Sequence, residues 1–276
     1  MAADVTTIHH DNIRYFSQVL DLVMKHTEED FGPYKLIPHD YDENGQRMRL
    51  TLIKKRNLDV FWSTSTTERE QYLRPVRFNL MRNLNHYRFL LIRKGESEHY
   101  QGIKTLPQLR QYTFGSGTHW SDTAILEDNE LSLTTAIKHN NLFRMLKAQR
   151  FDFMARGAYE VWTEIEDYKE DFELHPTLML RYPINYYFFV RPEDEHLAHR
   201  LQVGLERAAV DGSLDALFFS EPNYKRGWDE VHSGKYHIIT LDSEAVTGVP
   251  ASHETQTPTR LNPMPLNPSS TLNPLP

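Results

Sequence analysis

The chain has 276 residues, of which 38 are acidic and 31 basic, so its net charge is −7 with neutral histidines. This mild acidity disfavours a nucleic-acid-binding protein, because affinity for nucleic acids depends on clustered Lys and Arg. The sequence contains no cysteine, which excludes disulfides, thiolate nucleophiles and cysteine-ligated metal sites. No apolar run approaches the roughly 20 residues that a membrane-spanning helix needs.

Helix and strand patterns alternate along residues 1–245, which predicts an α/β fold with mostly parallel strands. Helices are expected at residues 12–26, 45–55, 140–149, 157–168 and 194–210. Strands are expected at residues 34–38, 58–62, 87–92, 112–115, 131–134, 151–154, 178–182 and 186–191. A glycine turn and a further helix follow the strand at 112–115.

Two segments of the sequence share one order of features. Residues 53–61 and 146–154 each contain the basic end of a helix, a tight turn and a strand that opens with apolar–Asp–apolar. Basic side chains suit the negative end of a helix dipole. The copies lie about 93 residues apart, beyond the periods of solenoid repeats. This repeated pattern favours two similar lobes over one continuous sheet. The alternative is chance repetition of a common structural unit.

The two ends of the chain differ in composition from its middle. The amino terminus has neither a basic segment nor an apolar core region, which indicates a cytoplasmic protein or one whose signal peptide has been removed. Residues 246–276 are rich in Pro, lack aromatic residues and repeat Leu-Asn-Pro at Leu261, Leu266 and Leu272. We expect a disordered or extended tail, because little apolar surface offsets the entropy of ordering it. A functional role for the repeated triplet is the alternative.

A hydroxyl-rich loop follows the strand at 58–62. Five Ser and Thr residues, 63–67, precede Arg69, and Trp62 lies beside them. Ligands of open α/β sheets bind beyond the carboxyl ends of strands. Arg with neighbouring hydroxyls suits a carboxylate or another anion. The alternative is a capped loop with Thr66 or Thr67 as the N-cap of a short helix.

A second candidate loop contains Gly115, Gly117, Thr118 and Trp120. A glycine turn before a helix can present backbone N–H groups to an anion. The loop lacks the third glycine of a dinucleotide site and the lysine of a phosphate loop. A Ser-His-Asp hydrolase is disfavoured, because triad members seldom come from one short segment and Gly-x-Ser-x-Gly is absent. Both tryptophans, Trp62 and Trp120, could stack on a ligand or belong to the core.

Charged residues also follow the strand at 151–154. Arg156 could hold an anion, and Glu160 lies four residues later; the alternative is a surface ion pair on a helix. His196 and His199 are spaced by three residues, but carboxylates at zinc-like spacing do not accompany them, so we expect no metal site. The acidic residues between Glu164 and Asp171 indicate a solvated face.

The order of these segments resembles the type II periplasmic solute-binding proteins, and within them the polar-amino-acid (family 3) branch of ABC-transporter receptors. The resemblance covers roughly residues 5–240. The segments that carry it are Thr66-Thr-Glu-Arg-Glu, Pro75-Val-Arg-Phe, Tyr87-Arg-Phe-Leu-Leu-Ile, Ile103-Lys-Thr-Leu-Pro, Gly115-Ser-Gly-Thr, Arg150-Phe-Asp and Asp211-Gly.

The resemblance implies a two-lobed periplasmic-binding-protein type II fold, with two mixed sheets joined by a two-strand hinge. Lobe 1 would comprise residues 1–91 and 191–245, and lobe 2 residues 92–190. The crossings would fall at 90–93 and 189–191.

The resemblance also implies a ligand site. The Arg of the family's Thr-x-x-Arg motif grips the ligand carboxylate and is matched by Arg69; the two hydroxyl positions are matched by Thr64 and Thr118. The family's ammonium-binding Asp is absent, because Gly157 occupies its position beside Arg156. An Arg there disfavours an ammonium group. We therefore predict a small anionic ligand. The predicted site residues are Arg69, Thr64, Thr118, Arg156, Trp62, Trp120, Gly117 and Glu160.

Together these features predict a non-catalytic, monomeric solute-binding protein of the periplasm, without metal or cofactor. It would close two lobes over a small, carboxylate-bearing ligand for uptake through a membrane permease or for sensing. One alternative is a ligand-sensing or partner-docking domain without a transport role. The other is a dehydratase-like enzyme on the same fold, with Glu160 and His119 as the candidate acid and base.

Overall fold

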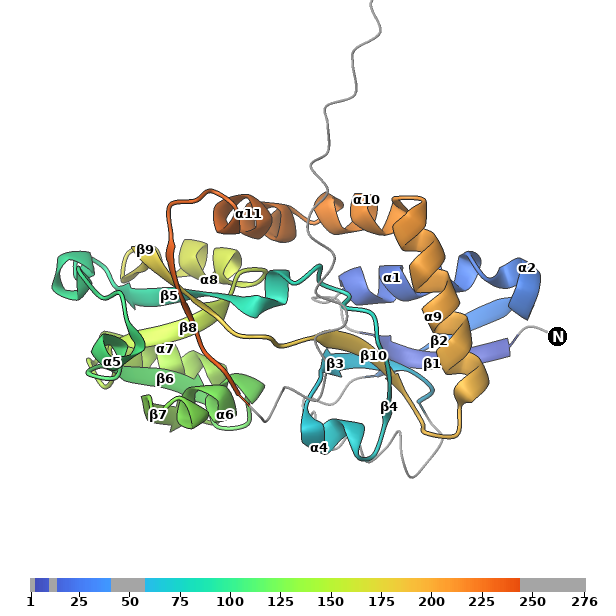
Figure 1. Cartoon of the computed structure of the whole chain (residues 1–276), viewed down its shortest axis with the longest axis horizontal. Helices are drawn as coiled ribbons and strands as arrows, with labels where there is room; N and C mark the ends of the chain where they lie inside the picture. Colours follow the sequence, from blue (N-terminus) through green and yellow to red (C-terminus); the bar gives the residue numbers. More distant parts are fainter. Residues whose placement is uncertain (1–2, 10–13, 41–57, 244–276) are drawn as a thin grey trace, which may run out of the picture.

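The computed structural model describes residues 3–9, 14–40 and 58–243, and the following concerns these residues. Their strands form a two-stranded, a three-stranded and a six-stranded sheet. We call the part around the six-stranded sheet lobe 2 and the part around the two smaller sheets lobe 1; they lie on the left and right of Figure 1. This mixed α/β architecture confirms the predicted α/β fold class. The expectation of mostly parallel strands was wrong, because four of the eight strand pairings in the described residues are antiparallel.

The sheet of lobe 2 has the strand order β11–β9–β5–β8–β6–β7. The strands are β5 (Tyr87–Arg93), β6 (Thr113–Gly117), β7 (Ser132–Ala136), β8 (Phe153–Gly157), β9 (Phe172–Arg181) and β11 (His237–Thr240). β6 is parallel to β7 and β8, and β5 is antiparallel to β8 and β9. Every residue of β8 is buried, as expected for a strand covered on both faces.

Helices α6 (Ser121–Asp128), α7 (His139–Lys147) and α8 (Val161–Asp167) follow β6, β7 and β8 in the chain. α7 buries Leu142, Phe143 and Leu146, which recur at helical spacing, in the core beneath the sheet. α6 begins four residues after β6 ends. The carboxyl end of β6 and the amino end of α6 therefore meet at one edge of lobe 2.

Lobe 1 is built on two small sheets. β1 (Ala3–His9) pairs in parallel with β2 (Tyr34–Asp40), and β10 (Tyr186–Val190) pairs antiparallel with β3 (Phe61–Thr64) and β4 (Arg74–Val76). A parallel bridge from Thr7 to Val60 joins the two sheets. They thus extend one another as a mixed layer.

The helices of lobe 1 pack around a shared apolar core. α1 (Arg14–Lys25) buries the side chains of Phe16, Val19, Leu20 and Val23, which form its apolar stripe. α9 (Glu195–Val210) lies against α1, and a Cβ atom on Gly204 would come within 2.4 Å of the Val23 carbonyl oxygen. Glycine therefore permits the close approach of these helices. α2 (Glu28–Phe31) and α4 (Thr67–Glu70) are single turns.

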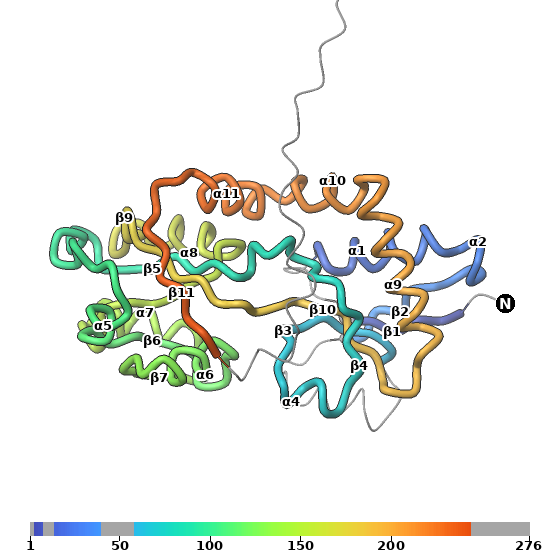
Figure 2. The backbone as a smooth tube through the Cα atoms, in the orientation of Figure 1, coloured from blue at the N-terminus to red at the C-terminus, as the bar shows by residue number. Residues whose placement is uncertain are grey.

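Two segments cross between the lobes in the middle of the molecule, residues 77–86 and 182–185 (Figure 2). Asn79 Nδ2 donates to Asn185 Oδ1 at 2.9 Å, and His86 Nε2 lies 3.2 Å from the same oxygen, so the two segments are tied together. The predicted crossings at 90–93 and 189–191 fall instead within β5 and at the end of β10. Strand periodicity alone cannot tell to which sheet a strand belongs.

The end of the described chain also differs from the expected lobe boundaries. After α9 come α10 (Ser213–Ser220) and α11 (Pro222–Val231), and β11 then pairs in parallel with β9 of lobe 2. Residues 237–240 thus return to lobe 2, whereas the family resemblance implied that all of 191–245 belongs to lobe 1. The helix expected at 45–55, residues 53–57 of the first copy of the repeated pattern and the tail 246–276 lie outside the described residues.

No helix in the described ranges is long and apolar enough to cross a membrane.

Candidate functional site

The two candidate loops lie in contact. Thr64 ends β3 in lobe 1, Ser121 begins α6 in lobe 2, and their hydroxyl oxygens lie 2.8 Å apart. The hydroxyl-rich loop and the glycine turn therefore face one another across the interface between the lobes. This contact and the charged and aromatic side chains described below form what we call the interlobe cluster. Its members are Thr64, Arg69, Arg88, Trp120, Ser121, Asp122, Arg156, Tyr159, Glu160, Glu164, Tyr182, Tyr186 and Tyr224.

Arg69 is oriented towards Thr64. Its guanidinium donates to the Thr64 carbonyl oxygen, and Nη1 lies 3.2 Å from the Thr64 hydroxyl. Its backbone N–H donates to the side chain of Thr66 at 3.1 Å, so Thr66 is the N-cap of α4. The sequence left two interpretations of this loop, a helix cap and an arginine beside hydroxyl groups, and the structure contains both. The cap at Thr66 positions Arg69.

Arg156 is engaged by carboxylates of its own lobe. Its Nε and Nη2 lie 2.7 and 2.5 Å from the two oxygens of Glu164, and Nη2 lies 3.2 Å from Glu160 Oε1. The guanidinium carbon lies 4.7 Å from the centre of the Trp120 ring system. Burial alone would lower the pKa of Arg156, but Glu160 and Glu164 outweigh it and raise the pKa. The charge of Arg156 is therefore balanced without a ligand.

Glu160 is held differently from Glu164. Its Oε1 accepts from the backbone N–H of Gly157 at 3.0 Å, and its side chain is still 33% exposed. Burial raises the pKa of Glu160, whereas Glu164, which takes both arms of Arg156, has a lowered pKa. Glu160 is consequently the carboxylate of this group that keeps an accessible face.

A second buried ion pair lies at the start of α6, and the sequence analysis missed it. Arg88 Nε donates to Asp122 Oδ1 at 2.7 Å, and the Tyr182 hydroxyl donates to the same oxygen at 2.5 Å. Burial would raise the pKa of Asp122, but the Arg88 charge and these hydrogen bonds lower it. The one signal in the sequence was Arg88 within strand β5, directly before the apolar run Phe89–Ile92.

Tyrosine side chains complete the interlobe cluster. Tyr159 of lobe 2 meets Tyr186 of lobe 1 and Tyr224 of α11, with ring centres 6.2 and 6.3 Å apart. Tyr186 also stacks on Phe16 of α1 at 5.4 Å. An aromatic layer thus runs from the core of lobe 1 to the edge of lobe 2. No pattern in the sequence indicates this layer, because its members are scattered along the chain.

The remaining predicted site residues have other surroundings. Trp62 is 7% exposed and stacks on Phe16, so it belongs to the core of lobe 1. Thr118 is exposed, and its backbone N–H donates to the Ala136 carbonyl. A Cβ atom on Gly117 would lie 2.4 Å from the Trp120 ring, so glycine allows the indole to fold over the turn. The amide of Thr118 is therefore used within lobe 2.

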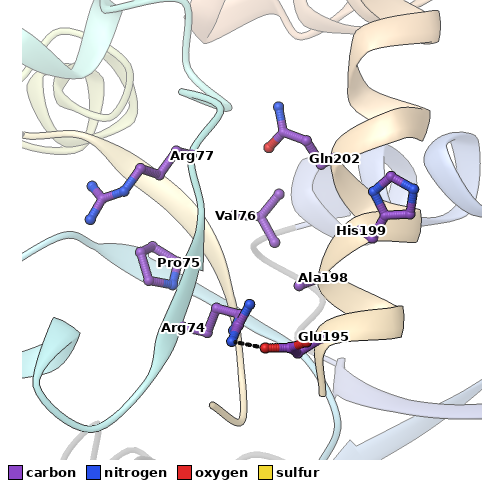
Figure 3. A pocket seen from close by; sticks show the side chains of 8 residues that line it. All are labelled: Arg74, Pro75, Val76, Arg77, Glu195, Ala198, His199 and Gln202. Atoms are coloured by element: carbon purple, nitrogen blue, oxygen red, sulfur yellow. Dashed lines mark hydrogen bonds and ion pairs between the residues drawn. The ribbon is translucent and has the colours of Figure 1, made fainter. Parts of the chain in front are cut away.

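An open groove of about 550 Å³ lies elsewhere in lobe 1, between β4 and α9 (Figure 3). Its lining residues are Arg74, Pro75, Val76, Arg77, Glu195, Ala198, His199 and Gln202. Arg74 and Glu195 form an ion pair of 2.7 Å across it. None of the predicted site residues lines this groove. Within the described part of the chain, no group of three His, Asp or Glu side chains is arranged to hold a metal ion.

No family model and no curated protein matches the sequence. Solved structures match the fold. An ancestral arginine-binding protein bound to arginine is 15% identical, with a TM-score of 0.57, over 80% of this chain and 99% of that chain. The GluR0 ligand-binding core from Nostoc punctiforme in complex with L-glutamate is 13% identical, with a TM-score of 0.56, over 80% and 99%.

A third similar structure is a putative binding component of an ABC transporter from Wolinella succinogenes complexed with lysine. It is 14% identical, with a TM-score of 0.59, over 80% of this chain and 96% of that chain. The resemblance to amino-acid receptors is thus confirmed at the level of the fold: the chain has the two-lobed fold of these solute-binding proteins.

Proposed function

We propose that the chain is a solute receptor that closes two lobes over a small ligand at the interlobe cluster. The observation that carries the proposal is the 2.8 Å contact between Thr64 and Ser121, which joins the two loops predicted to bind ligand. Of the three similar structures named above, two are described as binding arginine and glutamate, and the third is described as a binding component of an ABC transporter complexed with lysine. This supports an extracytoplasmic role in uptake or sensing, without catalysis.

Arg69 is the proposed contact for a carboxylate of the ligand. It is anchored by the N-cap Thr66 and by Thr64, and it lies beside the contact between the lobes. Arg156 contributes less to an anion site than its position in the sequence suggests, because Glu164 already neutralises it. The accessible face of Glu160 adds an acceptor for a donor group of the ligand. The proposed ligand therefore has a carboxylate that contacts Arg69. Its net charge depends on whether the donor group that it presents to Glu160 is neutral or cationic.

A partner-docking domain without a ligand is the second candidate. The observation that favours it is that Arg156 and Arg88 are both paired with carboxylates of the chain itself. The charges of these two arginines are thus balanced within lobe 2 and need no solute to neutralise them. The two candidates differ in whether any small molecule stabilises the protein.

Native mass spectrometry of freshly purified protein tests this choice, followed by a thermal-shift screen of organic acids, amino acids and neutral solutes. A co-purifying small acid, or stabilisation by carboxylates that Arg69→Ala abolishes, supports the receptor. A neutral compound that stabilises wild type and Arg69→Ala equally contradicts the carboxylate site. No bound mass and no stabilising compound would favour the docking domain.

A further inference from the structure

We infer that residues 213–243, which we call the strap, form a third connection between the lobes and limit their opening and closing. The strap comprises α10, α11, β11 and their links. α10 belongs to lobe 1 and β11 to lobe 2 (Figure 2). The inference concerns the hinge motion, goes beyond solute binding, and rests on the two-lobe organisation.

The lobe 1 end of the strap is anchored in the core. Leu214 and Phe218 of α10 are buried, and Phe218 contacts Tyr15 of α1 with ring centres 6.1 Å apart. The turn before α10 is also attached, because Asp211 forms an ion pair of 2.7 Å with His26 at the end of α1. α10 must therefore move with lobe 1.

The lobe 2 end of the strap is anchored at least as firmly. A Cβ atom on Gly227 of α11 would lie 2.0 Å from the Ala158 carbonyl oxygen, so the helix backbone rests directly on lobe 2. Asn223 donates to Thr163 of α8 at 3.0 Å, and the Arg226 guanidinium lies 4.2 Å from the Trp162 ring. β11 then continues the six-stranded sheet beside β9. β11 must therefore move with lobe 2, and α11 is held by both lobes, because its Tyr224 also contacts Tyr15 of α1 with ring centres 4.9 Å apart.

The link between these anchors is short and stiff. Only Glu221 separates the end of α10 from the start of α11, and Pro222 fixes the first turn of α11. Any rotation of one lobe against the other must change the angle between these helices. A flexible linker could absorb such a rotation, whereas one residue between two anchored helices resists it.

Arg82 couples the strap to the first crossing segment. It pairs with Asp215 of α10, and its guanidinium lies 5.7 Å from the ring of Phe219 and 5.4 Å from that of Trp228 in α11. Arg82 and Asn83 both adopt left-handed backbone conformations, with φ of 50° and 64°. An ordinary side chain is costly there unless its surroundings hold it. A hinge rotation would therefore have to displace Arg82 from both helices.

The absence of native cysteine allows a direct test by distance measurement between spin labels. Tyr72 in lobe 1 and Ile137 in lobe 2 are 57% and 81% exposed, so Cys replacements there can be labelled without touching the core. The doubly labelled protein is compared with the same protein carrying a Gly-Ser-Gly-Ser insertion after Glu221. The control has the identical insertion after Ser233, in the turn between α11 and β11.

If the strap limits the motion, the distances between the two spin labels should form one narrow distribution in the parent protein and in the Ser233 control. The insertion after Glu221 should broaden the distribution and shift it. An unchanged distribution in a folded Glu221 insertion variant would overturn the inference, as would a parent distribution already as broad as that variant.

Should the insertion prevent folding, Arg82→Gln provides the second test, with Arg74→Gln as its control because that ion pair lies within lobe 1. Broadening for Arg82→Gln alone supports the strap. No difference between these two variants contradicts it.

Discussion

At the scale of single residues, the ionic partners of each arginine decide its role. Arg156 and Arg88 lie in buried ion pairs with carboxylates of lobe 2, and Arg69 lies on the loop that touches lobe 2. Removing one partner of a buried pair leaves an unpaired charge, which costs several kcal/mol. Arg156 and Arg88 therefore stabilise lobe 2 through buried ion pairs, whereas Arg69 hydrogen-bonds to Thr64 beside the contact between the lobes.

Replacing Arg69 by Ala should weaken ligand binding, because it removes the proposed contact to the ligand carboxylate. A charge-assisted hydrogen bond to a carboxylate contributes roughly 1.5–3 kcal/mol, which corresponds to about tenfold to a hundredfold in affinity. Arg69→Lys should restore only part of the affinity, because Lys cannot form the bidentate fork. Calorimetric titration with the best carboxylate from the screen measures both. Full affinity in Arg69→Ala would show that the carboxylate binds elsewhere.

His26 makes the stability of the turn before α10 depend on pH. Its two ring nitrogens face acceptors, the Leu22 carbonyl at 2.8 Å and Asp211 at 2.7 Å, so the protonated ring satisfies both. Partial burial lowers the pKa of His26, but the bonds to Asp211 and Leu22 outweigh it and raise the pKa above 6.5. Asp211, with its pKa lowered to about 2 by bonds to Ser213 and His26, stays ionised throughout.

Because the folded pKa of His26 lies above the unfolded value, its contribution to stability is complete below pH 6.5 and is lost as the pH rises through the folded pKa. The melting temperature of His26→Gln should therefore fall below that of wild type by more at about pH 5.5 than at about pH 8.5. His232→Gln, at the end of α11, is the control. An equal difference at both pH values would contradict the ion pair.

At the scale of elements, glycines set how closely helices approach their neighbours. Gly204 lets α9 reach the backbone of α1, and Gly227 lets α11 reach the Ala158 carbonyl. In an isolated helix, Ala would be more favourable than Gly by about 1 kcal/mol. At these two positions the tertiary contact opposes that preference, because the methyl group would have to displace backbone atoms.

Gly227→Ala should therefore destabilise the protein despite the better helix propensity of Ala. Overpacking of this kind costs about 1–3 kcal/mol, which exceeds the gain in propensity. Urea unfolding measures the difference. Asp229→Ala in the same helix is the control, since it removes only an exposed ion pair with Lys225, worth less than about 1 kcal/mol. A more stable Gly227→Ala variant would mean that α11 does not rest on Ala158.

At the scale of the whole molecule, the lobes are joined more extensively than two crossing strands require. The crossings are tied to each other through Asn185, and the strap joins the lobes again through Glu221. The loops of the interlobe cluster add the contact between Thr64 and Ser121. Unfolding of one lobe would remove partners from the other in all these places.

We therefore expect one cooperative thermal transition for both lobes, with equal calorimetric and van't Hoff enthalpies. Differential scanning calorimetry checks this. The Gly-Ser-Gly-Ser insertion after Glu221 should reduce the cooperativity, whereas the insertion after Ser233 should not. Two separate transitions in the wild type would show that the lobes are energetically independent.

Local patterns in the sequence determined much of this molecule. The apolar stripe of α1, the basic end of α7 and the run of hydroxyls after β3 depend only on neighbouring residues, so the alternation of elements and the two candidate loops could be predicted. The helices α10 and α11 and the strand β11 were not predicted, and β11 has only four residues, too few for a clear periodic signal.

Only the tertiary structure decided which charges are neutralised and which sheet β11 joins. Arg88 and Asp122 are 34 residues apart and Arg156 and Glu164 eight, and no local pattern pairs them. The return of β11 to lobe 2 likewise depends on the free edge that β9 offers. The energy of such an ion pair arises only when the fold brings the two charged groups together away from water. The sequence could therefore indicate the candidate loops, but only the fold determines which charged groups pair there.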